Sequence, residues 1–319
     1  MFYVFYASRQ LLHTLSKKIS RVLLRAAMFM FSDGNKIRAE RWLRGREQFK
    51  KLEAADVVVV SFGKSGRTWL RVLLSRVYQL KHNLSRRNII GFDNLHYRNR
   101  AIPKIFFTHD NYIKDYTGHS DSKTDFYDKK VVLLARDPRD VAVSQFFQWK
   151  FRMKPNKKSL NQYPGQGQDV SMFDFVMDPG SGLPKIMEFM NRWAQESPRI
   201  SRFLLLRYED LKANPHETLK RLLEFMGTPA TDEQIAEAVE FASFENMKKM
   251  EQQRTFWLSG GRLLPKDRSN PDSYKVRRAK VGGYRDYFGD GEVERIDAMV
   301  ANALAPVFSY YADNYYADS

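Results

Sequence analysis

Short apolar runs alternate with longer amphipathic stretches along most of the chain. Four of the runs contain apolar residues only, and they lie at residues 57–60, 105–107, 131–134 and 203–206. Uninterrupted apolar runs of this length are typical of parallel strands that are buried on both faces. We therefore predict four strands that belong to a parallel sheet.

Helical patterns follow these strands. Helices are predicted over residues 66–80, after Pro138 through Trp149, over 215–226 and from Thr231 onward. The first has apolar residues at helical spacing, the third is followed by a glycine that suits a C-terminal stop, and the last opens with a capping-box sequence. Repeated strand-then-helix units predict the α/β class: a single domain with a central parallel sheet flanked by helices.

Two stretches are predicted to be loops. Residues 154–182 are rich in Pro, Gly, Asn, Gln and Ser, and residues 260–278 contain two prolines and many charges. A loop of this length inside a compact domain is usually functional or disordered. Both stretches are candidates for lids over a site.

The first 31 residues differ from the rest of the chain. They contain five basic residues and no acidic one, and their apolar residues recur at helical spacing. Two interpretations stay open: a basic amphipathic helix in peripheral contact with an anionic membrane, or a terminal helix packed on the domain. We divide the chain into a basic amphipathic N-terminal extension, residues 1–55, and the α/β domain, residues 56–319.

Composition narrows the classes of function. The chain of 319 residues contains no cysteine, which excludes disulfides, thiolate zinc sites and cysteine nucleophiles. This fits a reducing compartment, and we predict a cytoplasmic location, with the inner membrane surface as a second placement. The net charge of +16 attracts nucleic acid, acidic lipids or small polyanions such as nucleotides. The aromatic residues do not form the signature of an RNA-binding sheet, so we expect no nucleic-acid partner.

The strongest local motif is VVVVSFGKSGRTWL at residues 57–70, where a buried strand runs through a glycine-containing loop into a helix. Glycines let backbone amides approach an anion, the helix N-terminus adds partial positive charge, and Lys64 and Thr68 supply a cation and a hydroxyl. A Walker A loop needs a glycine where Val58 stands, so the loop is P-loop-like only.

A second motif, VVLLARDPRDVAVSQFF, occupies residues 131–147. Arg136 follows the strand and can form a forked pair of hydrogen bonds to a phosphate, and the hydroxyl of Ser144 can add another. Asp137 fits two roles equally, a magnesium ligand or the cap of the next helix.

Two further segments carry candidate chemistry. His109 follows a strand, where ligands of open α/β sheets bind, and it is either a general base or a structural histidine. Residues 277–284, RRAKVGGY, combine cations and glycines. They suit either a loop that folds over an anion or a solvated basic turn.

In order and spacing, these segments resemble the sulfotransferase family that uses 3′-phosphoadenosine-5′-phosphosulfate (PAPS) and releases PAP. The resemblance runs from about residue 56 to 288 and includes Tyr-Glu-Asp at residues 208–210 and Ser-Phe at 243–244. It implies a P-loop-like nucleotide-binding core. It also implies that His109 and Lys64 are catalytic and that the cofactor is bound by Lys64, Ser65, Gly66, Arg67, Thr68, Trp69, Arg136, Ser144, Tyr208, Ser243, Phe244, Arg277, Arg278 and Ala279.

The resemblance assigns roles within this set. The loop residues would surround the phosphosulfate, and Trp69 and Tyr208 would lie near the adenine. The 3′-phosphate would be held by Arg136, Ser144 and Arg277. His109 would remove the proton of a hydroxyl acceptor, which is a lipid, a glycan, a phenol or another metabolite, and no metal is expected.

The sequence departs from the family pattern at several positions. Gly63 replaces a usual proline, Arg67 a frequent threonine and Ala279 the lid glycine. Phe107 replaces the lysine before the catalytic histidine, and Arg67 is the candidate substitute for that missing cation. Gly-Asp at residues 289–290 stands where a dimer motif begins with Thr-Val, so a dimer of that type is unsupported and the oligomeric state is open.

Two other classes of function remain as alternatives. A P-loop-like kinase would use ATP and magnesium, with Lys64, Thr68 and Asp137 as ligands. A nucleotide-binding or nucleic-acid-binding module without catalysis would leave His109 idle. The missing Walker glycine and the extra arginines argue against the kinase. The positive charge exceeds what one cofactor requires, and an anionic membrane or an acidic glycan acceptor would account for the surplus.

Overall fold

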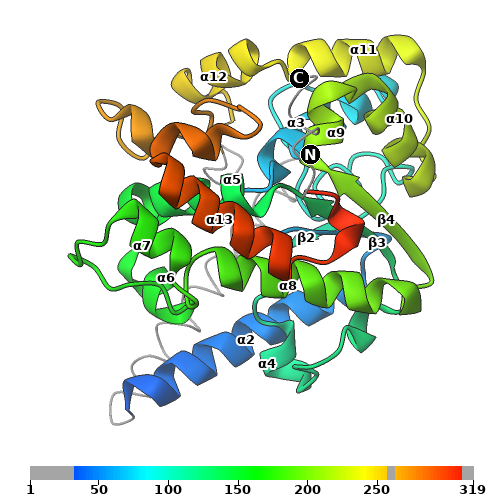
Figure 1. Ribbon diagram of the computed structural model, residues 1–319. Helices are drawn as coiled ribbons and strands as arrows, with labels where there is room; N and C mark the ends of the chain where they lie inside the picture. Colours follow the sequence, from blue (N-terminus) through cyan, green and yellow to red (C-terminus); the bar gives the residue numbers. More distant parts are fainter. Residues whose placement is uncertain (1–31, 257–262, 311–319) are drawn as a thin grey trace.

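A computed structural model of the protein describes residues 32–256 and 263–310, so the prediction for residues 1–31 lies outside the described residues. Four parallel strands form one sheet in the order β2-β1-β3-β4 (Figure 1). The strands are β1 (Val57–Val60), β2 (Ile105–Thr108), β3 (Lys130–Ala135) and β4 (Arg202–Arg207). The four predicted strands and the α/β class are therefore confirmed.

Alternation along β1 divides the interior into two hydrophobic cores. Val58 and Val60 face one core, Val57 and Val59 face the other, and all four are at most 1% exposed. Full burial of such side chains contributes roughly 1.5–3 kcal/mol each. The first core is covered by α5 (Pro138–Phe147), α7 (Met172–Met177), α8 (Leu183–Glu196) and α13 (Asp290–Ala303).

Helices of the second core gather at the top of Figure 1. They are α3 (Arg67–Lys81), α9 (Tyr208–Ala213), α10 (Pro215–Met226), α11 (Asp232–Phe241) and α12 (Phe244–Gln252). The predicted helix ends are confirmed where capping decides them. Gly227 follows α10 with a φ of 77°, and Thr231 and Gln234 form the capping box of α11.

The prediction for residues 154–182 is wrong in part, because two short helices lie there, α6 (Pro155–Leu160) and α7. Pro155 fits the first turn of a helix, and Ser171 caps α7 by accepting a hydrogen bond from the amide of Asp174 at 3.0 Å. Residues 263–278 contain no α-helix and one 3₁₀ turn, η4 (Pro271–Ser273). Other short helices are η1 (Thr124–Phe126), the π-helix η2 (Gln148–Arg152), η3 (Ser197–Arg199), η5 (Gly283–Tyr287) and η6 (Pro306–Phe308).

Helix α2 (Asp33–Glu53) packs against the short helix α4 (Ile113–Thr117) at the bottom of Figure 1. A side chain at Gly45 would overlap the carbonyl oxygen of Tyr112, so glycine permits the close approach. Leu52 is buried in the first core. Helix α2 falls inside the predicted extension 1–55, and the domain boundary stays a prediction.

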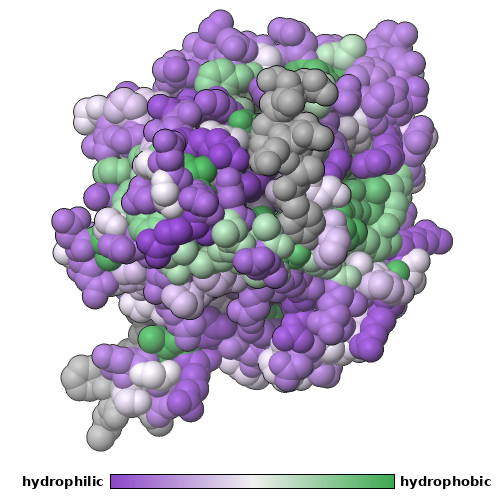
Figure 2. Space-filling model, viewed as in Figure 1, coloured by the Kyte–Doolittle hydropathy of each residue, from purple (hydrophilic) through white to green (hydrophobic). Residues whose placement is uncertain are grey.

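The surface is mostly polar. Figure 2 shows one face on which hydrophilic residues predominate and hydrophobic residues form separate patches. Within residues 32–256 and 263–310, no helix has both the length and the apolar character needed to cross a membrane.

Candidate active site

A cavity of about 1270 Å³ lies where the strands end at their carboxyl termini. Its wall includes residues that follow β1, β2, β3 and β4, together with residues from α2, α6, α8 and α12. The carboxyl edge of a parallel sheet is where open α/β proteins bind ligands. With the exception of Ser65, which is buried behind the wall, every predicted site residue lines this cavity.

The loop after β1 is held in an unusual backbone conformation. Lys64 has a φ of 75° and Gly66 a φ of 89°, and α3 begins at the next residue, Arg67. A Cβ at Gly66 would lie 2.6 Å from the ring of Tyr208, so this position requires glycine for both its conformation and its space. The tight loop therefore leads directly into the N-terminus of α3, and such loop-to-helix junctions bind anions.

Lys64 lies among other cations. Burial, followed by the positive charges of Arg277, Arg152, Lys275 and Arg136, lowers the pKa of Lys64 from 10.5 to about 7. A bound anion would reverse this effect, because it would stabilise the ammonium form. The electrostatics of the loop therefore favour a polyanion.

Arg136 extends from the end of β3 over the ring of Tyr208, with its guanidinium carbon 4.4 Å from the ring centroid. Its Nη2 donates to Asp140 and to the carbonyl of Lys280, both at 3.2 Å. Its buried Nε has no hydrogen-bond partner among the described residues. A buried donor without an acceptor is costly, so this atom fits a bound anion. Ser144 lines the same cavity.

Two carboxylates fix the basic segment 275–284, which we call the lid segment. Asp140 accepts hydrogen bonds from the amides of Gly282 at 3.1 Å and Tyr284 at 3.0 Å. Glu251, which is fully buried, accepts from the amides of Lys275 and Val276 at 2.9 Å each. The lid segment is therefore attached to α5 and α12.

The cations of the lid segment have different partners. Arg277 stacks over Phe147, with its guanidinium carbon 3.6 Å from the ring centroid. Arg278 and Lys280 form surface ion pairs with Asp286 at 2.8 Å each. All three cations line the cavity, and Arg278 and Lys280 are in addition paired with Asp286. Ala279 adopts a φ of 51°, the left-handed conformation that glycine prefers.

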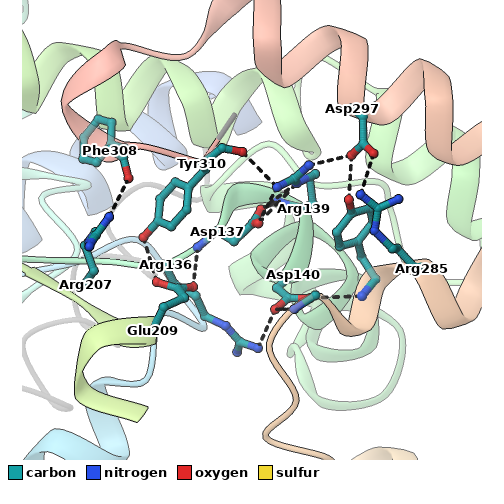
Figure 3. Close-up of polar contacts among 12 residues, drawn as sticks. Arg136, Asp137, Arg139, Asp140, Arg207, Glu209, Arg285, Asp297, Phe308 and Tyr310 are labelled. Atoms are coloured by element: carbon teal, nitrogen blue, oxygen red, sulfur yellow. Dashed lines mark hydrogen bonds and ion pairs between the residues drawn. The ribbon is translucent and has the colours of Figure 1, made fainter. Parts of the chain in front are cut away.

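Asp137 belongs to a buried network behind the cavity (Figure 3). It caps α5 by accepting from the amide of Arg139 at 2.9 Å, and both of its oxygens accept from the Arg139 guanidinium. Arg139 also pairs with Asp297 at 2.6 Å. Asp137 does not line the cavity, so the capping interpretation is correct and the magnesium interpretation lacks support.

Glu209 joins the same network from the Tyr-Glu-Asp segment. It accepts from the amide of Asp137 at 2.9 Å and from the hydroxyl of Tyr310 at 2.8 Å (Figure 3). Burial raises its pKa to about 7. Its neighbour Tyr208 lies in the cavity wall, edge-to-face with Trp69 at 5.6 Å between ring centroids. Trp69 is fixed by a hydrogen bond from its Nε1 to the carbonyl of Ala242 at 2.9 Å.

Ser243 and Phe244 begin α12 on the same side of the cavity. The hydroxyl of Ser243 caps α12 by accepting from the amide of Asn246 at 3.4 Å, and Phe244 is the first helical residue. Both line the cavity. The Ser-Phe pair thus has a local structural role as well as its place in the wall.

His109 has a defined tautomer. Its Nδ1 lies 2.7 Å from the carbonyl oxygen of Ser61, which can only accept, so Nδ1 carries the proton. Its Nε2 lies 2.6 Å from Nη2 of Arg67, which can only donate, so Nε2 presents its lone pair. Burial, then the charge of Arg67, lowers the pKa of His109 well below 6.5. The imidazole is therefore neutral, and its accepting nitrogen contacts Arg67, which lines the cavity.

Phe107, which stands where the family has a lysine, packs against an arginine of α3. The guanidinium carbon of Arg71 lies 3.6 Å from the centroid of the Phe107 ring. Arg67 is the cation that contacts the histidine itself. The sequence indicated Arg67 as the substitute, and the structure places it against the imidazole.

Sequence reasoning missed four groups around the site: Asp140, Glu251, Arg139 and the cations of α2 and α8. Lys157 of α6 lines the cavity and lies in residues 154–182, which the sequence indicated as a candidate lid. Asp140 had a usable signal, since it lies one helical turn after Arg136. Glu251 and the cations of α2 and α8 had none, because long-range packing brings them to the lid segment and the cavity.

Comparison with known proteins gives the family. A family model described as the sulfotransferase domain matches residues 54–307, so the chain belongs to the sulfotransferase domain family. Flavonol 3-sulfotransferase from Flaveria bidentis is 26% identical over 288 residues, covering 83% of this chain and 88% of the relative. Cytosolic sulfotransferase 16 from Arabidopsis thaliana is 29% identical over 276 residues, covering 77% and 75%.

The fold is also similar to that of a solved sulfotransferase. The crystal structure of mouse sulfotransferase SULT7A1 complexed with PAP superposes with a TM-score of 0.53 at 18% identity, covering 84% of this chain and 91% of that chain. The predicted family and fold class are thus confirmed.

Proposed function

We propose that the protein transfers the sulfuryl group of PAPS to a hydroxyl acceptor, with His109 as general base. One observation carries the proposal: a neutral, cavity-lining histidine, whose accepting nitrogen contacts Arg67, lies beside a cation-rich loop at the ends of adjacent strands. The family membership supports the same reaction class.

The residues of the cavity fit PAPS. The loop from Lys64 to Thr68 would hold the 5′ end, and its surrounding cations explain why an anion is needed there. The buried, unpartnered Nε of Arg136 would donate to the 3′-phosphate, with Ser144 and Arg277 beside it. Trp69, Tyr208 and Phe244 would contact the adenine. SULT7A1, which shares the fold, was solved with PAP, the product of PAPS.

Bound PAPS supplies a sulfuryl group whose bond to the 5′-phosphate breaks, with the electron pair leaving on PAP, as the acceptor oxygen bonds to sulfur. His109 takes the hydroxyl proton of the acceptor at Nε2. Its Nδ1 already carries a proton, which it uses in a hydrogen bond to the carbonyl oxygen of Ser61. The ammonium of Lys64 stabilises the negative charge that develops at the 5′ side. Arg67 must leave Nε2 before that nitrogen can accept the proton.

Titration calorimetry with PAP, ADP and magnesium-ADP tests the cofactor assignment. Two or three charge-assisted hydrogen bonds to the 3′-phosphate, at roughly 1.5–3 kcal/mol each, predict that PAP binds on the order of 100-fold more tightly than ADP. Equal affinity for ADP would show that no 3′-phosphate site exists. A strong preference for magnesium-ADP would support the kinase instead.

The acceptor and the location are also proposals. A hydroxyl on a small molecule or a glycan suits the mechanism, and one relative is named a flavonol sulfotransferase. We propose a cytoplasmic location, because the chain has no cysteine and several relatives are named cytosolic sulfotransferases. Peripheral membrane contact through residues 1–31 stays a prediction.

A further inference from the structure

The cavity extends well beyond the residues that fit PAPS. We call the part that includes His109 and the residues of α2, α4, α6 and α8 the acceptor half, and the part around Lys64, Arg136 and the lid segment the cofactor half. Cationic side chains line the acceptor half on several sides, and they include Arg41, Arg44, Lys114, Lys157, Lys185 and Arg192. Among the described residues that line the whole cavity, fifteen are Lys or Arg and six are Asp or Glu.

Several of these cations are already neutralised within the protein. Arg41 forms a bidentate pair with Asp115 at 2.9 Å, and Arg44 pairs with Glu40 at 2.6 Å. Lys123 pairs with Asp110 at 2.6 Å. These three ion pairs fix α2 and the segment after β2, so no bound ligand is needed to explain these cations.

Lys157 of α6 is different. Its side chain is exposed and lines the cavity, and no carboxylate lies within 4.0 Å of its Nζ in the ranges that the structure describes. Although the residue is exposed, the cavity wall partly desolvates its ammonium group, and this desolvation, followed by the charges of Arg44, Arg67 and Lys154, lowers the pKa of Lys157. The site around Lys157 thus has positive charge in excess.

Lys157 and Arg67 act on the same histidine. Arg67 contacts Nε2 of His109, and the charges of both cations lower the pKa of that imidazole. Arg67 also lowers the pKa of Lys157. An anion bound by Arg67 and Lys157 would reduce this repulsion and draw the guanidinium away from Nε2. The nitrogen would then be able to accept the hydroxyl proton.

We infer that the acceptor is itself an anion, a molecule whose carboxylate, phosphate or sulfate group binds Arg67 and Lys157 close to the hydroxyl that His109 deprotonates. The inference rests on the proposed function and names the substrate class of its site. A neutral acceptor leaves Arg67 on the imidazole and therefore reacts slowly. An anionic acceptor draws Arg67 away from Nε2 when it binds, and so frees His109 to accept the proton.

Binding of matched probes to the PAP-saturated protein tests the inference, because PAP occupies the anion sites of the cofactor half. Three pairs differ in charge: 4-hydroxyphenylacetate and its amide, methyl glucuronide and methyl glucoside, and glycerol 3-phosphate and glycerol. The pairs distinguish a phenolic acid, an acidic sugar and a phosphate ester. At least one anionic member should bind about tenfold more tightly than its neutral partner.

The Lys157→Gln variant should reduce that preference to less than threefold. Lys154→Gln is the matched control, because Lys154 precedes the same helix and is exposed, but does not line the cavity. It should keep the wild-type preference. Loss of the preference in both variants would assign it to the general charge of the surface and would overturn the inference.

The histidine gives a second readout. In NMR titrations, the anionic probe should raise the pKa of His109, and Lys157→Gln should weaken that shift. Binding of all anionic probes within threefold of their neutral partners, or no binding of any probe at 10 mM, overturns the inference while the preference for PAP over ADP still supports the sulfotransferase. Loss of the PAP preference itself would instead refute the proposed function.

Discussion

The two halves of the cavity are both basic, but the protein holds their cations in different ways. In the cofactor half, Arg136 is fixed by Asp140, and the lid segment that carries Arg277 is fixed by Asp140 and Glu251. In the acceptor half, Arg41 and Arg44 are paired with carboxylates, but Lys157 lies on a six-residue helix and has no carboxylate partner among the described residues. Carboxylates thus anchor Arg136 and the lid segment in the cofactor half, whereas the acceptor half has a lysine that pairs with no described carboxylate and acts on the base. This difference suits an invariant cofactor on one side and an acceptor that activates the base on the other.

The largest expected effect is at His109, which lies between the two halves. His109→Ala should lower the single-turnover rate with labelled PAPS by about 100-fold or more, the usual contribution of a general base. PAP affinity should stay within twofold, because the cofactor half is untouched. An unchanged rate would show that His109 is not the general base.

The Arg136→Ala variant tests the cofactor half alone. PAP should bind about 10- to 100-fold more weakly, whereas AMP should bind almost as before, because the lost hydrogen bonds go to the 3′-phosphate. Arg136→Lys is the control: it keeps the charge but lacks the Nε donor and the planar fork, so it should restore only part of the preference. Equal weakening of PAP and AMP would place Arg136 elsewhere on the nucleotide.

The sequence predicts the cofactor half better than the acceptor half, because the main loop of the cofactor half is one continuous segment, whereas the acceptor half is assembled from helices far apart in the chain. The loop at residues 63–68 follows an all-valine strand and opens a helix, and the chain itself encodes both its glycine conformation and its position at the sheet edge. The acceptor half depends on α2 and α6. Helix α2 has few apolar residues and approaches α4 through Gly45, and α6 is too short to show a period.

Asp137 and the lid segment show a second limit. The sequence left two roles open for Asp137, and Arg139 decides between them, since its guanidinium occupies both carboxylate oxygens. For the lid segment the sequence left two roles open, and in the structure Arg277 and Arg278 both line the cavity while Arg278 is also paired with Asp286. Neither role can be predicted from the sequence alone, because each depends on which side chains lie nearby in the folded protein.

The third prediction concerns pH and Lys64. Its pKa of about 7 in the free protein means that PAP binding above pH 7 requires uptake of a proton. PAP affinity should therefore fall by up to tenfold per pH unit between about pH 7.5 and 9, as each unit leaves fewer free molecules with a charged Lys64. Calorimetry in buffers of different ionisation enthalpy measures the proton uptake directly.

Lys64→Met is the control for this dependence. It should bind PAP weakly and with no proton uptake over the same pH range. The unliganded wild-type protein should also gain stability as pH rises from 7 toward 10.5, because the unfolded chain then binds more protons at this residue than the folded chain does. Proton uptake that persists in Lys64→Met would assign the titration to another group.

The smallest expected effect comes from Glu251, whose role is to hold the lid segment. Glu251→Gln keeps one oxygen but places an amide donor against backbone amides that also donate, so one of the hydrogen bonds to Lys275 and Val276 is lost. PAP affinity should fall about fivefold, which corresponds to roughly 1 kcal/mol. Binding of the anionic probes to the PAP-saturated protein should not change, because the acceptor half does not depend on the lid segment. The exposed Glu224→Gln, outside the cavity wall, should leave both affinities unaltered. Equal losses in the two halves would mean that the lid segment supports both, and that they do not bind their ligands independently.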